Sequence, residues 1–115
     1  MKANELRIGN YVEYSGELVN IVGITEEHPF INMITIDYLE YEEIRPIPLT
    51  EEWLIKFGFE HHKHQEDMYF ISGMQVWNCN DLFMCNKNGI ILNSVHRLQN
   101  LYFALTKEEL TYENI

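Results

Sequence analysis

The sequence predicts an α+β fold, because most of the chain consists of short β-type segments and only two stretches have helical features. The short segments are rich in β-branched and aromatic residues, and turn residues separate them at short intervals. Pro46 and Pro48 interrupt this pattern, and both helical stretches follow them. A sheet, a short helix, more sheet and a final helix, in that order, are typical of an α+β protein.

The segment before the prolines predicts a small curved sheet. Residues 11–14 form its first strand, a Ser-Gly turn follows at 15–16, and residues 18–25 form the returning strand. A third strand covers residues 30–37, and a short piece around Ile44 ends at the prolines, which cannot donate to a ladder. Strands this short are typical of a small SH3-like β-barrel, with a curved meander as the alternative.

A short amphipathic helix follows the prolines. Thr50 is a favoured N-cap residue, and Glu51 and Glu52 lie in the first turn, where the helix dipole favours acids. Gly58 lies where a helix-terminating glycine belongs. The apolar stripe of this helix consists of Trp53, Leu54 and Phe57, and we expect Trp53 and Phe57 to be largely buried.

The region after this helix predicts a second set of short antiparallel strands. Turn residues separate the segments, and Asn88-Gly89 between two apolar runs is among the strongest hairpin signals. The predicted strands lie within residues 58–62, 68–72, 74–78, 82–86 and 89–93.

The last helical stretch covers residues 95–106 and begins after Ser94, a favoured N-cap residue. At roughly 100° per residue, one arc carries an apolar stripe that we expect to be buried in the core. That stripe consists of Val95, Leu98, Leu101, Tyr102 and Leu105. A different arc carries His96, Gln99 and Phe103, and this second arc is either a contact face for a partner or a face packed under the adjacent sheet.

At 115 residues, the chain is expected to form a single compact domain over residues 1–115. A boundary near residues 46–50 stays open, and it would divide an SH3-like module, 1–48, from a helix-sheet-helix module, 49–115. The sequence has neither an apolar run long enough to cross a bilayer nor the apolar region of a signal peptide at its start. Cys79 and Cys85 are expected to be reduced thiols in a cytoplasmic protein.

The net charge of −10 is high for this length and argues against direct binding of free nucleic acid. Residues 1–60 hold 12 acids and 4 bases, so most of the negative charge lies in the first half. Such a surface repels phosphate backbones and attracts basic protein surfaces, including those on which other proteins bind nucleic acid. No membrane partner is expected.

An acidic stretch with interleaved tyrosines runs from residue 37 to residue 52 and is the first candidate binding surface. Charge would accelerate encounter with a basic partner, and the aromatic side chains would supply buried area. A solvated face with two helix-start glutamates is the alternative. The candidate residues are Asp37, Tyr38, Glu40, Tyr41, Glu42, Glu43, Glu51 and Glu52, together with His96, Gln99 and Phe103 of the last helix.

The histidine cluster at His61, His62 and His64 is the candidate metal site, and we expect it to hold no metal. Zinc requires three or four converging ligands, whereas on an extended segment only His62 and His64 share a face. Signatures of hydrolases, P-loops, dinucleotide-binding folds and zinc proteases are absent from the sequence. The sequence therefore predicts a protein that is not an enzyme and has no cofactor.

Three blocks of the sequence resemble a small uncharacterised protein family of Bacteroidetes phages and prophages. They are ELRIGNYV at 5–12, PIPLTEEWLIKFGFE at 46–60 and VHRLQNLYFALTKEEL at 95–110, and the last is the most specific. Arg97 and Lys107 depart from the glutamine and glycine usual in that family. The family has no agreed activity, so the resemblance implies only a context, a small phage protein acting inside an infected bacterium.

Three hypotheses about function follow. The first is a non-enzymatic inhibitor of a host defence enzyme that handles nucleic acid, most concretely an anti-CRISPR protein that binds a CRISPR effector nuclease. The second is a phage accessory module that binds a replication, packaging or virion partner through an SH3-like barrel. The third is a minor metal-binding or enzymatic role at His62 and His64. The identity of the partner and the oligomeric state stay open.

Overall fold

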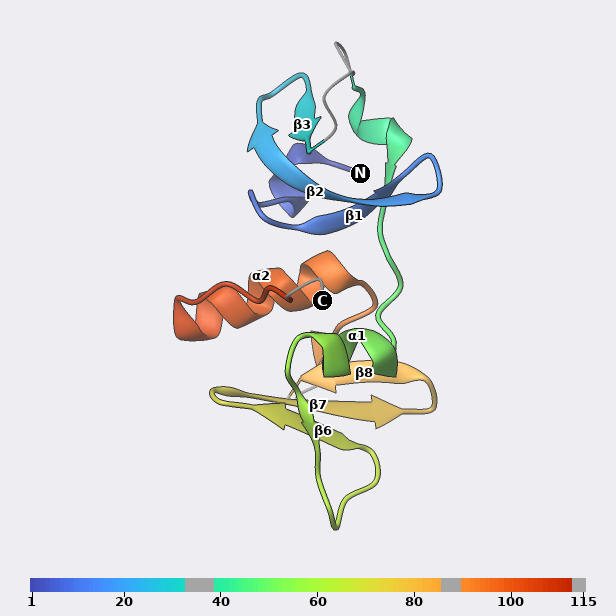
Figure 1. Ribbon diagram of the computed structural model, residues 1–115, viewed down its shortest axis with the longest axis vertical. Helices are drawn as coiled ribbons and strands as arrows, with labels where there is room; N and C mark the ends of the chain where they lie inside the picture. The colour runs from blue at the N-terminus through green and yellow to red at the C-terminus, as the bar shows by residue number, and fades with distance from the viewer. Residues whose placement is uncertain (33–38, 86–89, 113–115) are drawn as a thin grey trace.

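The first half of the chain forms a curled antiparallel sheet of four strands, as the computed structural model of the protein shows (Figure 1). The structure describes residues 1–32, 39–85 and 90–112. The strands lie in the order β3-β2-β1-β4, which gives a half-barrel. They are β1 (Tyr11–Tyr14), β2 (Glu17–Ile24), β3 (Pro29–Ile31) and β4 (Ile44–Arg45), with 3₁₀ turns η1 (Ala3–Glu5) before them and η2 (Tyr41–Glu43) before β4.

The hairpin between β1 and β2 is the best-defined local feature of this sheet. Ser15 and Gly16 both have positive φ, 51° and 81°, as a two-residue type I′ turn requires. The turn sets the register, which pairs Tyr14 with Glu17 and Val12 with Val19. The inner face of the half-barrel encloses a hydrophobic cluster of Leu6, Val12, Val19, Ile21, Ile31, Leu39, Tyr41 and Ile44.

The second half of the chain begins with a short helix and continues as a five-stranded antiparallel meander. Helix α1 (Glu51–Lys56) begins at Thr50, whose hydroxyl accepts a hydrogen bond from the Trp53 N–H at 3.4 Å. The strands follow in chain order as β5 (Glu60–His61), β6 (Met68–Ile71), β7 (Met74–Cys79), β8 (Leu82–Cys85) and β9 (Ile90–Ile91).

A second hydrophobic cluster lies between this sheet, α1 and the last helix. Its buried members are joined by side chains that are only partly buried, among them Trp53 and Leu101. Phe57 is buried as expected, whereas Trp53 keeps part of its indole exposed. The cluster consists of Leu49, Leu54, Phe57, Phe59, Tyr69, Met74, Val76, Phe83, Cys85, Leu92, Val95, Leu98, Tyr102 and Leu110.

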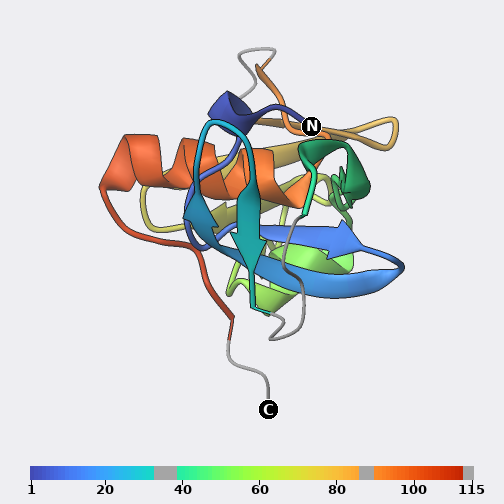
Figure 2. The same cartoon turned by 90° about the horizontal axis from the view of Figure 1, so that it is seen from above.

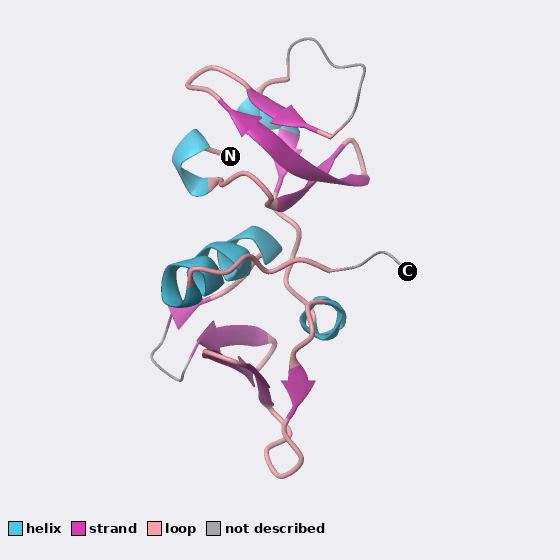
Figure 3. Cartoon of the chain, turned by 60° about the vertical axis from the view of Figure 1, so that its left-hand side comes forward, coloured by secondary structure: helices cyan, strands magenta, loops and turns pink. Residues whose placement is uncertain are grey.

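Helix α2 (Val95–Thr106) lies between the two sheets (Figures 1 and 3). Seen from above, the curled first sheet lies across this helix (Figure 2). The chain after α2 then returns across the molecule toward α1 (Figure 3). Because both sides of α2 are covered, the buried arc of the helix is wider than a single core stripe.

This position corrects the expected faces of α2. Leu105 was expected in the core but is 50% exposed, and Leu101 is only partly buried. His96 and Gln99, which a contact face would expose, are 3% and 0% exposed. The buried arc is rotated toward the polar side of the helix, because that side packs on the first sheet.

The segment around the two prolines connects the two halves. Pro48 forms an isolated bridge with Ser94, and the Val95 N–H donates to the Ile47 carbonyl at 2.8 Å. The two hydrophobic clusters are separate and lie on opposite sides of α2 (Figure 1). The residues of the first cluster precede the two prolines in the sequence and those of the second cluster follow them, so the prolines mark the possible boundary near residues 46–50.

The α+β class, the curled first sheet, the second antiparallel sheet and the C-terminal helix packed on it agree with the prediction, which did not include the contact of that helix with the first sheet. Strand β3 ends at Ile31, and the rest of the predicted strand, from residue 33, lies outside the described residues, as does the Asn88-Gly89 turn. Within residues 1–32, 39–85 and 90–112, no helix is long and apolar enough to cross a membrane.

Candidate protein-binding surface

The first group of predicted acids surrounds η2 and is exposed. Glu40, Glu42 and Glu43 all point to solvent, and the Glu40 N–H donates to the Glu43 carboxylate at 2.9 Å. This local bond caps the 3₁₀ turn and holds the glutamates together. Asp37 and Tyr38 lie outside the described residues.

Tyr41 was expected to supply aromatic area to this group, and that expectation is wrong. Its side chain is 8% exposed and belongs to the first hydrophobic cluster. Its hydroxyl donates to the Thr25 carbonyl, and burial raises the pKa of the phenol. Tyr41 therefore anchors η2 on the half-barrel and is not available to a partner.

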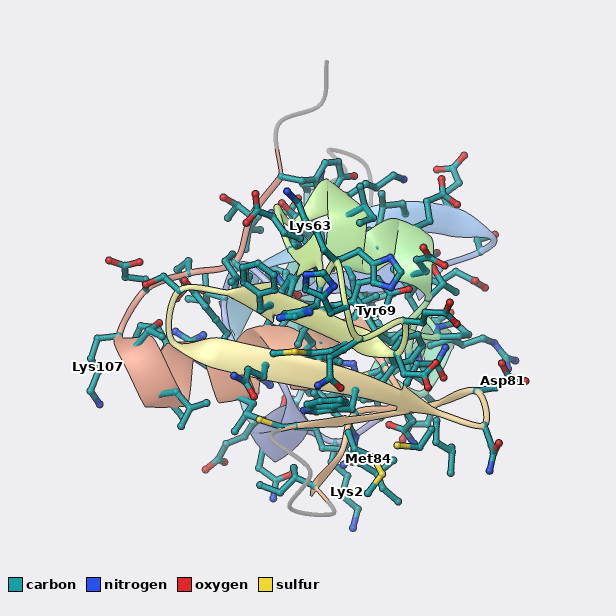
Figure 4. All side chains as sticks on the ribbon, turned by 90° about the horizontal axis from the view of Figure 1, so that it is seen from below. Lys2, Lys63, Tyr69, Asp81, Met84 and Lys107 are labelled. Atoms are coloured by element: carbon teal, nitrogen blue, oxygen red, sulfur yellow. The ribbon has the colours of Figure 1, made fainter. Side chains whose placement is uncertain are left out.

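The second group of predicted acids lies in the first turn of α1. Glu52 is exposed and forms an i,i+4 ion pair with Lys56 at 3.8 Å. Glu51 is also exposed but interacts with the hydroxyl of buried Tyr69, a residue of β6 in the second sheet (Figure 4). Burial and the neighbouring Glu51 carboxylate raise the pKa of Tyr69.

These acids have few compensating cations. Glu42 and Glu43 form no ion pair with any residue that the structure describes, and Glu40 has only His28, at 4.0 Å. The two groups lie on different halves of the molecule, one above the other along its long axis in Figure 1. The predicted stretch is therefore two acidic sites connected by the proline segment, and not one continuous patch.

A cluster of four aromatic rings lies beside the acids of α1. Tyr11, Trp53, Phe57 and Tyr112 have ring centroids 5.0 to 6.3 Å apart, in tilted and edge-on arrangements that aromatic pairs favour. Phe57 is buried, and the other three rings are partly exposed. Burial is the main cause of the raised pKa of Tyr11.

The side chain of Lys56 shows what this aromatic cluster can bind. Its ammonium lies 5.0 Å from the centre of the Trp53 ring and 5.7 Å from that of Tyr112. Both distances are within the range of a cation–π interaction. With the Glu52 carboxylate also close, the cluster and α1 form an anionic, aromatic site suited to a positively charged side chain.

The acids of this site were predictable from the sequence, whereas its aromatic cluster was not. Tyr11 and Tyr112 come from opposite ends of the chain, and they meet Trp53 only because the segment after α2 folds back. Trp53 was assigned to the core as part of an amphipathic stripe. Its i,i+3 spacing from Lys56 was the only local signal of the cation–π contact.

The predicted contact face on α2 is not a free surface. The Gln99 side chain accepts from the Tyr11 N–H at 2.8 Å and donates to the Gly9 and Leu110 carbonyls at 3.1 and 3.0 Å. The ring of Phe103 is partly covered by the Arg7 guanidinium, 3.7 Å from its centre. His96 is buried, so of the three predicted residues only Phe103 retains exposed area.

A polar contact therefore joins α2 to the segment that precedes β1. Asn10 donates to the Asn100 side chain at 2.8 Å, and Asn100 donates to the Glu5 carbonyl at 2.9 Å. Arg7 also pairs with Glu109, at 2.5 Å. The segments 5–12 and 95–110 thus contact each other, which gives them a structural role.

The side chains of His61 and His62 in the histidine cluster contact neighbouring residues. The His61 ring stacks on Tyr69, with centroids 4.8 Å apart, and its Nε2 bonds to the Glu66 carbonyl. The His64 N–H donates to His62 Nδ1 at 3.1 Å. In the described part of the chain, no three metal-binding side chains gather into a group. The absence of a bound metal stays a prediction.

The cysteines do not form a reactive pair. Cys85 is 1% exposed on β8, and burial raises the pKa of its thiol, which disfavours the thiolate. Cys79 is exposed at the end of β7, and both cysteines are free thiols.

Comparison with known proteins adds no relative. No protein-family model matches this chain, and no curated protein or solved structure is significantly similar to it.

Proposed function

We propose that this protein is a non-enzymatic binding protein that docks on a basic, nucleic-acid-binding surface of another protein. Two observations carry the proposal together: the exposed glutamates around η2 are largely uncompensated, and a separate aromatic cluster beside α1 already contacts an ammonium group. Carboxylates attract a basic surface over a distance, and partly exposed aromatic rings supply contact area and cation–π energy after contact.

The binding mode follows from the place of Lys56. An arginine or lysine of the partner would displace the Lys56 ammonium from the Trp53 and Tyr112 rings and pair with Glu52. The glutamates around η2 would contact other basic side chains further along the partner's nucleic-acid-binding groove. Two anionic sites along an elongated molecule, 50 Å in its longest dimension, suit an extended nucleic-acid groove better than a point contact.

The most concrete partner is a CRISPR effector nuclease, so the protein would be an anti-CRISPR inhibitor of phage or prophage origin acting in the host cytoplasm. The family resemblance of the three sequence blocks supports the phage context. The acidic surface supports the choice of target, because a nuclease channel that holds nucleic acid is strongly basic. In this proposal the protein excludes nucleic acid by covering its binding surface.

An accessory role in phage replication, packaging or virion assembly is the second candidate. It is favoured by exposed apolar side chains on the outer face of the half-barrel, where Leu18, Val22 and Phe30 are 45%, 49% and 48% exposed. Such side chains on an SH3-like sheet are a surface for a partner that need not be basic. Charge would then contribute little to binding.

The test is surface plasmon resonance on the partner captured from a host lysate, with a triple charge reversal of Glu40, Glu42 and Glu43 to lysine. The matched control reverses Glu60, Glu66 and Asp67, which are also exposed but lie on the hairpin of the second sheet. We expect the η2 variant to slow association by about tenfold, since steering acts on encounter. The control variant should slow association less.

Two further measurements separate the candidates. Wild-type association should slow as salt brings the Debye length below about 8 Å, and nucleic acid bound to the partner should block binding. The accessory role would be supported instead if the association rate changed neither with salt nor with the triple charge reversal, and if nucleic acid on the partner did not block binding. In that case Phe30→Ala, on the outer face, should speed dissociation.

A further inference from the structure

A pocket of about 270 Å³ opens at the beginning of α2, where the two halves of the molecule meet. Its walls come from η1, from the proline segment and from the first turn of α2. They include Glu5, Pro46, Pro48, Ser94, His96 and Arg97. Pockets that bind small molecules are frequent at such junctions, because elements from separate cores leave a concave space between them.

Two buried polar side chains in the wall of this pocket have unpaired atoms. Ser94 and His96 are each 3% exposed. Neither the Ser94 hydroxyl nor His96 Nδ1 makes a hydrogen bond to any residue within the described ranges. Buried polar atoms are nearly always paired, so two unpaired atoms in neighbouring residues that line one pocket indicate a missing partner.

The backbone at this helix end is also incompletely bonded. Ser94 has the extended conformation of an N-cap residue, with φ −146° and ψ 158°, yet its side chain forms no capping bond. The Val95 N–H donates to Ile47, and the first bond within the helix runs from the Leu98 N–H to the Ser94 carbonyl. The N–H groups of His96 and Arg97 are therefore the donors that a cap or a ligand would satisfy.

We propose that this pocket binds the phosphate group of a small phosphate ester, at the N-terminus of α2. The His96 and Arg97 N–H groups, the Ser94 hydroxyl and the Arg97 guanidinium supply donors, and the helix dipole favours the negative charge. The side chains of Pro46 and Pro48 form an apolar wall against which the organic part of the ester packs.

Glu5 opposes the bound anion and sets how tightly it is held. Its carboxylate lies 4.0 Å from the Arg97 guanidinium and accepts a hydrogen bond from the Lys2 N–H at 3.0 Å. Phosphate must take the place of Glu5 beside Arg97. Replacing this carboxylate by a neutral amide should therefore strengthen phosphate binding, whereas removing the guanidinium should weaken it.

The experiment is an NMR titration of the ¹⁵N-labelled protein with inorganic phosphate and, separately, with ribose 5-phosphate at constant ionic strength. Ribose and acetate serve as the neutral and the carboxylate probes. We expect saturable shifts of the His96 and Arg97 amide resonances with both phosphate probes, and tighter binding of the ester. Saturation with acetate at the same concentrations would overturn the choice of phosphate.

Variants test the assignment of the donors. Arg97→Gln should weaken phosphate binding by about tenfold, and Glu5→Gln should strengthen it by about threefold. Lys63→Gln is the matched control, since it removes one cation from the exposed hairpin between β5 and β6 (Figure 4), which contributes no residue to the pocket. The proposal is overturned if no phosphate probe saturates, or if Lys63→Gln weakens binding as much as Arg97→Gln.

Discussion

Helix α2 contacts the two sheets through surfaces of opposite chemistry. Toward the second sheet it presents Val95, Leu98 and Tyr102, all fully or nearly fully buried among apolar side chains. Toward the first sheet it presents Gln99 and Asn100, whose amides bond to backbone and side-chain groups around β1. One helix thus completes a hydrophobic core on one side and a hydrogen-bonded contact on the other.

The two surfaces differ in how strictly they specify their partner. Apolar packing tolerates substitutions that preserve volume, because dispersion and burial have no preferred direction. The Gln99 amide uses three bonds to atoms in separate segments, so it accepts only one position of the helix on the first sheet. The polar side therefore fixes the arrangement of the two halves, and the apolar side supplies most of the burial.

The largest predicted effect comes from removing the polar contact without changing its volume. Gln99→Met should lower the free energy of unfolding by about 3–5 kcal/mol, since the Tyr11 N–H and the Gly9 and Leu110 carbonyls lose their buried partner. Urea unfolding followed by circular dichroism measures this loss. On the apolar side, Leu98→Met should cost less than about 1.5 kcal/mol, and equal losses in the two variants would erase the proposed difference.

The apolar side can be tested on its own with two leucines of α2. Leu98 is 0% exposed and Leu105 is 50% exposed. Leu98→Ala should cost about 3 kcal/mol through the cavity that it leaves, while Leu105→Ala should stay within about 0.5 kcal/mol. Thermal and urea unfolding of both variants give the comparison. If Leu105→Ala lowered the free energy of unfolding about as much as Leu98→Ala, Leu105 would be buried in solution, as helical periodicity predicts.

These two surfaces also show where sequence reasoning works and where it stops. The burial of Val95, Leu98 and Tyr102 follows from helical spacing, because an apolar arc of a helix packs against the core. The burial of Gln99 could not be predicted. An amide enters the interior only when particular backbone groups meet it, and here those groups belong to residues distant in sequence, Gly9 and Tyr11. Leu105, near the end of α2, is 50% exposed although helical spacing places it on the same arc.

The candidate binding surface also has one part that the sequence predicts and one part that it does not. The exposure of Glu40, Glu42 and Glu43 follows from their charge alone. The aromatic cluster depends on a contact between the two ends of the chain, Tyr11 with Tyr112, which no local pattern contains. Properties of a single segment were predictable, and properties that require two segments to meet were not.

The smallest predicted effect concerns the beginning of each helix. Thr50 caps α1 through its hydroxyl, whereas Ser94 occupies the equivalent position of α2 without a capping bond. Thr50→Ala should therefore cost about 1 kcal/mol, and Ser94→Ala less than about 0.5 kcal/mol, when both are measured by urea unfolding in buffer without phosphate.

Phosphate then sharpens the comparison between the two caps. Ligand that binds only the folded state raises its stability, so phosphate should stabilise the wild type and the Thr50→Ala variant by the same amount. It should stabilise Ser94→Ala less, because that variant lacks a donor in the pocket. If Ser94→Ala loses as much stability as Thr50→Ala without phosphate, the Ser94 hydroxyl is an ordinary cap in solution, and the pocket at the beginning of α2 loses one of its donors.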